Sequence, residues 1–275
     1  MADNLSSSYT KYLHLINQLK LFDDDFMTLA LRDKNCVELI LTLILQRSIH
    51  IDNVYTQDVM KNLIGRSGIL DIVAIDTSGI LYNLDVQNNS EGAHPKRLRY
   101  HGSIMDIHFT DVNMSWKDIP QRYVIFITQK DVMKKGLPIY HIRQRIDEDD
   151  HEFDDETCMI YVNGENEDDT PLGRLMHDFK CTNPDDMYYD LLRERVKYFK
   201  EDKRGVEEMC KIWDDIKKEG KEEGKIEGKR EGLKEGIHVG KIGTYKQLYD
   251  DGVLTKEQFE FYIQNIQIPI TTLAV

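Results

Sequence analysis

The sequence contains no apolar run of the length that a membrane-spanning helix requires, about 20 residues. The longest candidate covers residues 37–45, is interrupted by Glu38, and is better interpreted as a buried helix. The first five residues, from Met1 to Leu5, lack the basic region and following apolar stretch of a secretory signal. We therefore expect a cytoplasmic protein with no membrane partner.

Cysteine is scarce as well. The four thiols stand at positions 36, 158, 181 and 210, and none belongs to a Cys-x-x-Cys pair. This spacing excludes a disulfide framework and a zinc site of the usual kind. The sequence also has no glycine-rich phosphate loop and no Gly-x-Ser-x-Gly motif, which removes two common classes of catalytic site from consideration.

Basic residues are outnumbered, with 36 Lys and Arg against 49 Asp and Glu in 275 residues, for a net charge of −13. Twelve of the acids lie between Asp147 and Asp169, a stretch without Lys or Arg, so the other 252 residues carry a charge of only −1. The global charge therefore does not exclude a nucleic-acid partner. The acidic stretch is interpreted as a solvated loop, with DNA mimicry or recruitment of a basic partner as alternatives.

With 40% hydrophobic residues, the chain can build a core. Apolar periodicity predicts helices and strands in the following order: helices over 9–20 and 35–48, strands over 69–75 and 80–87, a helix over 94–109, strands over 122–128, 139–146 and 157–162, and a helix over 187–199. This order predicts one α/β domain that covers most of residues 1–205.

The tail differs in kind. Glycine recurs every four residues from 220 to 240, and Glu precedes five of these six glycines. Each Gly destabilises a helix by about 1 kcal/mol relative to Ala, but a row at this spacing would let two helices approach closely. We predict a helical linker over 206–240 through which the chain forms a homo-oligomer, with a flexible spacer as the alternative. Residues 241–275 are expected to close with a helical hairpin, whose capping box starts at Thr255.

Two acidic side chains are predicted to meet across a β-hairpin. A three-residue loop over 77–79, with Gly79 in the left-handed conformation, pairs Asp76 with Ile80, so that every pair of positions sums to 156. Asp71 then lies opposite Asp85, and Gln87 shares the face of Asp85 because strand side chains alternate.

Carboxylates that face each other among Ile, Leu and Val destabilise the fold by several kcal/mol unless something neutralises them. A divalent cation does so directly, since Mg²⁺ prefers one or two carboxylates plus water and phosphate oxygens. Two alternatives stay open at this point. Asp71 and Asp85 could lie on a solvated face with Asn83 and Gln87, or a register slip of one residue could separate them onto opposite faces.

This hairpin, the Arg97-x-Arg99-Tyr100 segment after it and the Gly-Lys-x-Glu-Gly units of the tail resemble the PD-(D/E)XK nuclease superfamily. The nearest likeness is to its transposase-like, recombination-promoting branch, and it extends over residues 20–240. The resemblance implies a restriction-endonuclease-like αβββαβ core, a mixed central sheet flanked by helices. The likeness departs from the superfamily pattern in two places: no proline precedes Asp71, and Gln87 stands where lysine is usual.

The resemblance also implies roles for individual residues. Asp71 and Asp85 would hold Mg²⁺ or Mn²⁺ with the backbone carbonyl of Val86, and Gln87 would orient the attacking water. An acid from the first helices would complete the catalytic set, with Glu38 as the leading candidate and Asp25 as its rival. Phosphates of DNA would be contacted by the basic helix, through Lys96, Arg97, Arg99 and Tyr100.

The expected function is therefore hydrolysis of DNA phosphodiester bonds by a metal-dependent endonuclease related to transposases and DNA recombination. The alternative is a catalytically inactive relic of a mobile element that binds DNA or associates with itself. A third hypothesis is an acidic adaptor that recruits a basic partner through residues 147–169.

Overall fold

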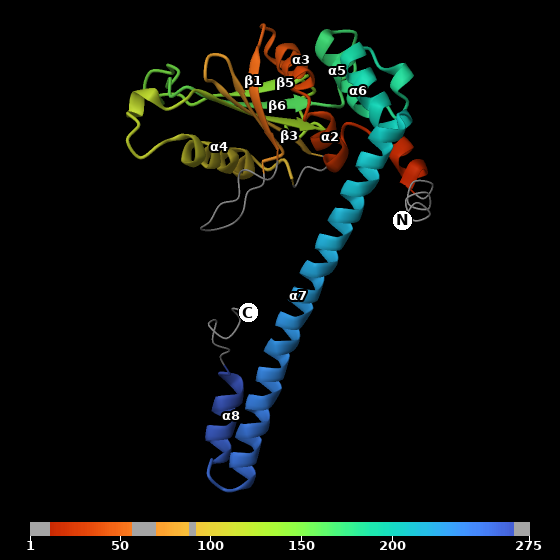
Figure 1. The fold of residues 1–275 in the computed structure, drawn as a ribbon. Helices are drawn as coiled ribbons and strands as arrows, with labels where there is room; N and C mark the ends of the chain where they lie inside the picture. Colours follow the sequence, from red (N-terminus) through yellow and green to blue (C-terminus); the bar gives the residue numbers. More distant parts are fainter. Residues whose placement is uncertain (1–11, 57–69, 88–91, 267–275) are drawn as a thin grey trace. The chain divides into compact units, whose positions relative to one another are not determined.

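The computed structural model describes residues 12–56, 70–87 and 92–266 (Figure 1). Residues 9–11 of the first predicted helix, residue 69 of the first predicted strand and residues 267–275 of the tail lie outside this part. The chain divides into two compact units, residues 1–208 and 209–275. The first unit is an α/β fold with a mixed sheet of six strands flanked by helices.

Most elements of the first unit fall within a few residues of their predicted positions. In chain order they are α2 (Asp24–Ala30), α3 (Lys34–Leu45), β1 (Ile51–Thr56), β2 (Ile72–Asp76), β3 (Leu81–Gln87), α4 (Pro95–Phe109), β4 (Arg122–Thr128), β5 (Ile139–Ile142), β6 (Thr157–Asn163), α5 (Pro171–Lys180) and α6 (Asp190–Glu201). Three were not predicted from periodicity: α2, β1 and α5.

The sheet has the strand order β1-β2-β3-β4-β6-β5. The first three strands form an antiparallel meander, β4 is parallel to both β3 and β6, and β5 returns antiparallel to β6. The elements from α3 to β4 follow the order αβββαβ. The parallel crossover from β3 to β4 is made by α4, because parallel neighbours need a connection of a dozen or more residues.

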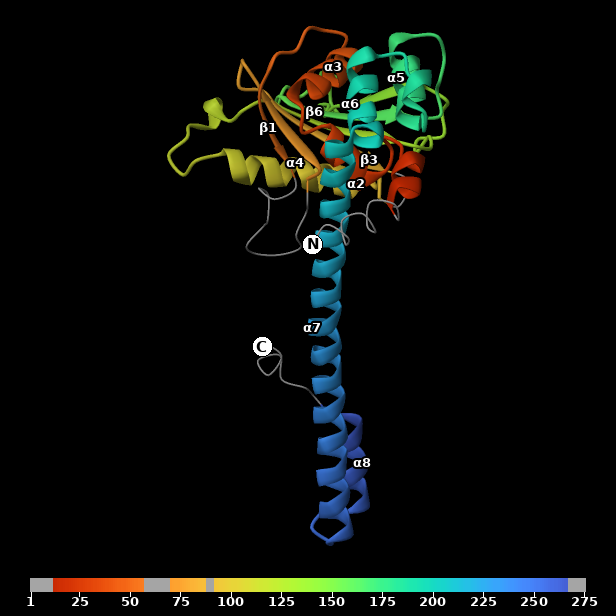
Figure 2. The same cartoon turned by 45° about the vertical axis from the view of Figure 1, so that its right-hand side comes forward.

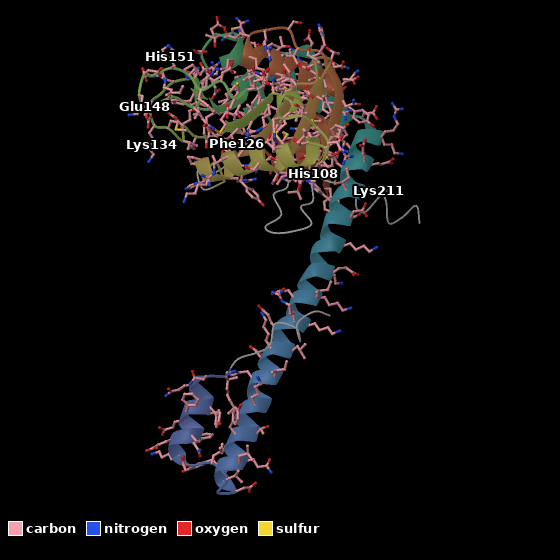
Figure 3. The ribbon with its side chains drawn as sticks, turned by 90° about the vertical axis from the view of Figure 1, so that its left-hand side faces the viewer. His108, Phe126, Lys134, Glu148, His151 and Lys211 are labelled. Carbon is pink, nitrogen blue, oxygen red and sulfur yellow. The ribbon has the colours of Figure 1, made fainter. Side chains whose placement is uncertain are left out.

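Helices cover both faces of the sheet. Figures 1 and 2 show α4 along one face and α3 with α6 along the other. Beneath α4 lies a buried apolar cluster that includes Val73, Leu81, Leu98 and Phe126. Figure 3 shows Phe126 inside the domain. This packing holds α4 directly against the face of β3 that carries Asp85.

The predicted acidic loop is an ordered extension of the β5–β6 hairpin. A bridge pairs Arg145 with Glu152, and the backbone N–H of Ile146 donates to the carbonyl of His151 at 2.9 Å. Ion pairs join Arg143 to Glu152 at 2.6 Å and Arg145 to Asp150. Its acids are therefore partly neutralised by arginines of the same extension.

The second unit is helical. Helix α7 (Lys203–Asp250), which starts in the first unit, continues without a break through all six glycines of the repeat, and α8 (Lys256–Gln264) follows a tight turn. Thr255 and Gln258 form the predicted capping box. Tyr245 stacks on Tyr262 with ring centroids 5.1 Å apart, which closes the predicted helical hairpin.

Within the described ranges, no helix combines the length and the apolar character that crossing a bilayer would demand.

Candidate active site

The β2–β3 hairpin has the predicted register. Its pairs run from Ile72 with Leu84 to Ile75 with Leu81, and the sum of positions is 156 throughout. The turn closes as expected, with Gly79 at a φ of +82°. The alternative of a one-residue slip is therefore wrong, and Asp71 stands one step beyond the last pair.

The two carboxyls are buried side by side. Asp85 is 0% exposed and Asp71 is 5% exposed, so the alternative of a solvated face is wrong. The carboxyls lie within hydrogen-bonding reach of each other, and the backbone N–H of Val86 donates to Asp71. Among the described residues, Oδ2 of each aspartate has no hydrogen-bond donor. Two buried acceptor atoms are thus left unsatisfied at one point of the fold.

Burial sets the protonation of this pair. It is the largest cause that raises the pKa of both Asp71 and Asp85, since a charge without water is disfavoured. Repulsion from Asp85 raises the pKa of Asp71 further. Without a cation the pair therefore tends to retain a proton.

Gln87 lies between a carboxylate and a guanidinium. Its amide nitrogen donates to Oδ1 of Asp85, and its carbonyl oxygen accepts from Nη1 of Arg97 at 2.9 Å. The side chain is buried. These two bonds orient the amide, with its nitrogen toward the carboxylate pair.

Arg97, in the first turn of α4, points toward the carboxylates. Its Nη2 lies 3.7 Å from Oδ2 of Asp85, Nη1 also donates to the carbonyl of Gly92, and Nε donates to Nε2 of His101 at 3.3 Å. The side chain is 39% exposed. The spacing of four residues places Arg97 and His101 on one face of α4, and the structure turns this face toward Asp85.

His101 contacts Asp85, and Asn83 contacts His101. His101 is buried, and its Nδ1 lies 3.2 Å from both Oδ2 of Asp85 and Oδ1 of Asn83. Burial lowers the pKa of His101 to about 3, so the ring is neutral. Because Nε2 accepts from Arg97, the ring proton is on Nδ1 and is donated to Asn83. Asn83 in turn donates to the carbonyl of Ile72.

Sequence reasoning did not assign a role to these two side chains. Asn83 carried a usable signal, because it alternates with Asp85 and Gln87 on one face of the strand.

The predicted helical acids are Glu38 and Asp25, but the helical acid whose charge acts on both Asp71 and Asp85 is Asp24. Glu38 accepts from the backbone N–H of Ile51 at 2.9 Å and pairs with His50, so it fixes the start of β1. Asp24, exposed at the start of α2, is the helical acid whose charge raises the pKa of both Asp71 and Asp85. Its neighbour Asp25 instead raises the pKa of Asp24.

The remaining predicted contacts lie around the first turns of α4. Lys96 and Arg99 are exposed, whereas Tyr100 packs partly buried against the core. Their contact with DNA stays a prediction, as does the role of the Val86 carbonyl as a metal ligand. The helix start itself is built by His94, whose ring accepts from the backbone N–H of Lys96 at 3.0 Å.

A second cluster has metal-ligand chemistry but a structural explanation. In the described part of the chain, His177, Asp178 and Cys181 are the one group of three such side chains with ligand atoms within 4.8 Å. Both carboxylate oxygens of Asp178 accept backbone N–H groups, from Tyr188 and Tyr189, at the start of α6. Burial raises the pKa of Cys181 to about 11, so it is a thiol. We interpret this cluster as structural.

The donor set at Asp71 and Asp85 fits a hard divalent cation. It offers two carboxylates with unsatisfied oxygens and no sulfur, and no third His, Cys or carboxylate of the described chain lies within 4.8 Å of both. Such a site leaves coordination positions for water and phosphate, as Mg²⁺ requires. No family model, curated protein or solved structure matches the chain.

Proposed function

We propose that the chain is a metal-dependent DNA endonuclease of the PD-(D/E)XK type, related to the transposase-like branch. The observation that carries the proposal is the buried pair Asp71 and Asp85, each with an oxygen that receives no hydrogen bond from the described residues. An unsatisfied buried carboxylate costs several kcal/mol, which a cation would recover. The αβββαβ order of elements and the position of the pair on its hairpin agree with this type.

Asp71 and Asp85 would hold Mg²⁺ or Mn²⁺ together with the carbonyl of Val86. When bound, such an ion polarises the scissile phosphate and lowers the pKa of a nearby water. His101 lies against Oδ2 of Asp85 and is itself oriented by Asn83, and Oδ1 of Asp85 accepts from Gln87. Asp24 of α2 would be the helical acid that completes the catalytic set, because its charge acts on both Asp71 and Asp85.

Gln87 would orient the attacking water. Its amide nitrogen donates to Asp85, so the atom that would accept a hydrogen from the water is the carbonyl oxygen, which in the metal-free protein accepts from Arg97. An amide cannot remove a proton at neutral pH, so Gln87 acts by positioning. The released proton would leave through the solvent.

DNA would be held by the exposed start of α4. Lys96 and Arg99 offer two cations to phosphate oxygens, and phosphate contacts position a duplex without reading its sequence. The partly buried Tyr100 stands beside them. This surface predicts binding that weakens as the salt concentration rises.

The test is nicking of a supercoiled plasmid with Mg²⁺ or Mn²⁺. Asp85→Asn keeps the shape of the side chain but removes a ligand, and we expect a loss of about a hundredfold or more because metal catalysis supplies several kcal/mol. Asp111→Asn, an exposed acid outside the site, should cut like the wild type.

Two results would contradict the proposal. One is an intact plasmid with both metals, and the other is Asp85→Asn cutting at the wild-type rate. DNA binding without cleavage in either metal would instead support the inactive relic.

A further inference from the structure

We infer that Arg97 and the divalent cation are alternative counter-ions of Asp85. In the metal-free protein Arg97 lies beside the carboxylate of Asp85, and it moves from Asp85 to a DNA phosphate when the cation binds. This inference rests on the proposed function and adds a regulatory step at the same site.

The contact between Arg97 and Asp85 is built for exchange. Nη2 and Oδ2 are 3.7 Å apart, which is beyond hydrogen-bonding distance, so the attraction is through space and lacks the two parallel bonds of a strong arginine–carboxylate pair. A bidentate pair would hold the guanidinium in place. Within the described part of the chain, Oδ2 of Asp85 is left without a hydrogen-bond donor.

The two cations would compete for Asp85. A Mg²⁺ ion bound to Oδ2 at about 2.1 Å would lie at most about 6 Å from Nη2 of Arg97 in its present position, from the metal–oxygen distance and the 3.7 Å contact together. Charges of equal sign at this separation repel strongly in a site of low dielectric. The doubly charged ion neutralises two carboxylates, so Arg97 is the one displaced.

Displacement also prepares Gln87. Its carbonyl oxygen now accepts from Nη1 of Arg97, while its nitrogen donates to Asp85. When Arg97 leaves, that oxygen becomes available to the attacking water at the moment the cation arrives. The same movement thus couples metal binding to the orientation of the nucleophile.

The movement would break the hydrogen bonds of Arg97 to Gln87, Gly92 and His101, and water would have to replace them. Arg97 is 39% exposed at the start of α4, and its neighbours Lys96 and Arg99 are exposed on the same helix. His101 and Asn83 are buried and would remain beneath Asp85. A released guanidinium therefore joins two cations that already face solvent, where a phosphate can accept its paired donors.

The experiment measures Mn²⁺ affinity by electron paramagnetic resonance, without DNA. Arg97→Gln should bind Mn²⁺ at least about tenfold more tightly than the wild type, a gain of about 1.4 kcal/mol, because the competing cation is gone. Arg97→Lys, which keeps a positive charge, should gain less. Lys117→Gln, which removes an equal charge from an exposed position outside the site, should change the affinity by less than about twofold.

The controls separate the two proposals. If Asp85→Asn binds Mn²⁺ like the wild type, the metal site itself is wrong. If Asp85→Asn abolishes binding but Arg97→Gln binds no more tightly than the wild type, the exchange is overturned while the metal site stands.

A second measurement uses the wild type and therefore tests the exchange even if the Arg97→Gln variant does not fold. In the ¹⁵N-labelled wild type, the Nε–H signal of Arg97, assigned by its loss in Arg97→Lys, should shift when Mg²⁺ is added. A signal that stays unchanged at saturating Mg²⁺ would overturn the exchange.

Discussion

Asp71 and Asp85 face opposite demands at the scale of single residues. Burial favours a proton on the pair, whereas a metal site needs both carboxylates ionised. Their neighbours reduce this conflict without removing it, because Arg97 and Gln87 both lower the pKa of Asp85. The free energy of unfolding should therefore fall as the pH rises and should increase when a divalent metal is added.

The pH dependence has a definite sign. The folded pKa values of Asp71 and Asp85 are raised above the ordinary value of 3.8, so the folded state binds more protons than the unfolded state in the window above that value. Their contribution to stability is present at low pH and is lost as the pH rises through the folded pKa values. In EDTA, we expect the free energy of unfolding to fall between about pH 4 and about pH 9, by up to about 1.4 kcal/mol per pH unit for each proton that only the folded state retains.

Urea denaturation at both pH values, with and without Mg²⁺, would check this expectation. Asp71→Asn should flatten the dependence in EDTA, and Mg²⁺ should restore stability to the wild type at the higher pH. A wild-type profile as flat as that of the variant would contradict the assignment of raised pKa values.

At the scale of elements, one buried lysine ties three segments together. Lys200 of α6 is 3% exposed, and its Nζ donates to the carbonyls of Asn17, Leu19 and Thr182. Asn17 belongs to the helical segment that includes residues 12–18, Leu19 to the chain leading to α2, and Thr182 to the turn after α5. The ammonium group thereby positions α2, and with it Asp24, relative to the rest of the domain.

Lys200→Met should destabilise the first unit. The variant keeps most of the side-chain volume but leaves three carbonyls without a donor, and we expect a loss of about 3 kcal/mol or more. Thermal or urea unfolding measures the effect. Lys211→Met, at an exposed position of α7 (Figure 3), should shift stability by less than about 0.5 kcal/mol. Equal shifts in the two variants would show that Lys200 does not act as a tie.

Helix α7 is continuous across residues of low helix propensity. Its six repeat glycines lie within one continuous helix, and a Cβ atom added at any of them would meet nothing within 4 Å. The chain itself therefore does not require glycine at these positions. Self-association through the row stays a prediction.

At the scale of the whole molecule, the distribution of charge affects how strongly the protein would bind DNA. A net charge of −13 opposes any approach to DNA, and most of that charge lies in residues 147–169. Asp147 and Glu148 are exposed there, and Figure 3 shows Glu148 at the periphery of the domain. Repulsion between exposed charges and DNA is screened within about 10 Å at 0.1 M salt.

The double variant Asp147→Asn/Glu148→Gln should bind DNA severalfold more tightly at about 0.05 M salt and no more tightly at about 0.3 M, where screening is strong. Fluorescence anisotropy with a labelled duplex measures both conditions. An increase that persists at high salt would indicate a direct contact rather than a general charge effect. An unchanged affinity at low salt would show that the extension lies away from the bound DNA.

The sequence by itself determined the hairpin, because strand alternation and a glycine-containing loop define a register without reference to the rest of the fold. It also indicated most elements, since their apolar periods are local. The exception among the strands was β1, an edge strand whose side chains are mostly half-buried or exposed, so its apolar pattern is weak.

Only the tertiary structure decided which side chains from other elements meet the hairpin. It brought the charge of Asp24 to the pair while Glu38 bonded to the start of β1, and it turned Arg97 and His101 toward Asp85. These contacts join residues far apart in the chain. They depend on where each helix packs on the sheet and on its rotation about its own axis, and neither quantity is encoded in the spacing of residues within one segment.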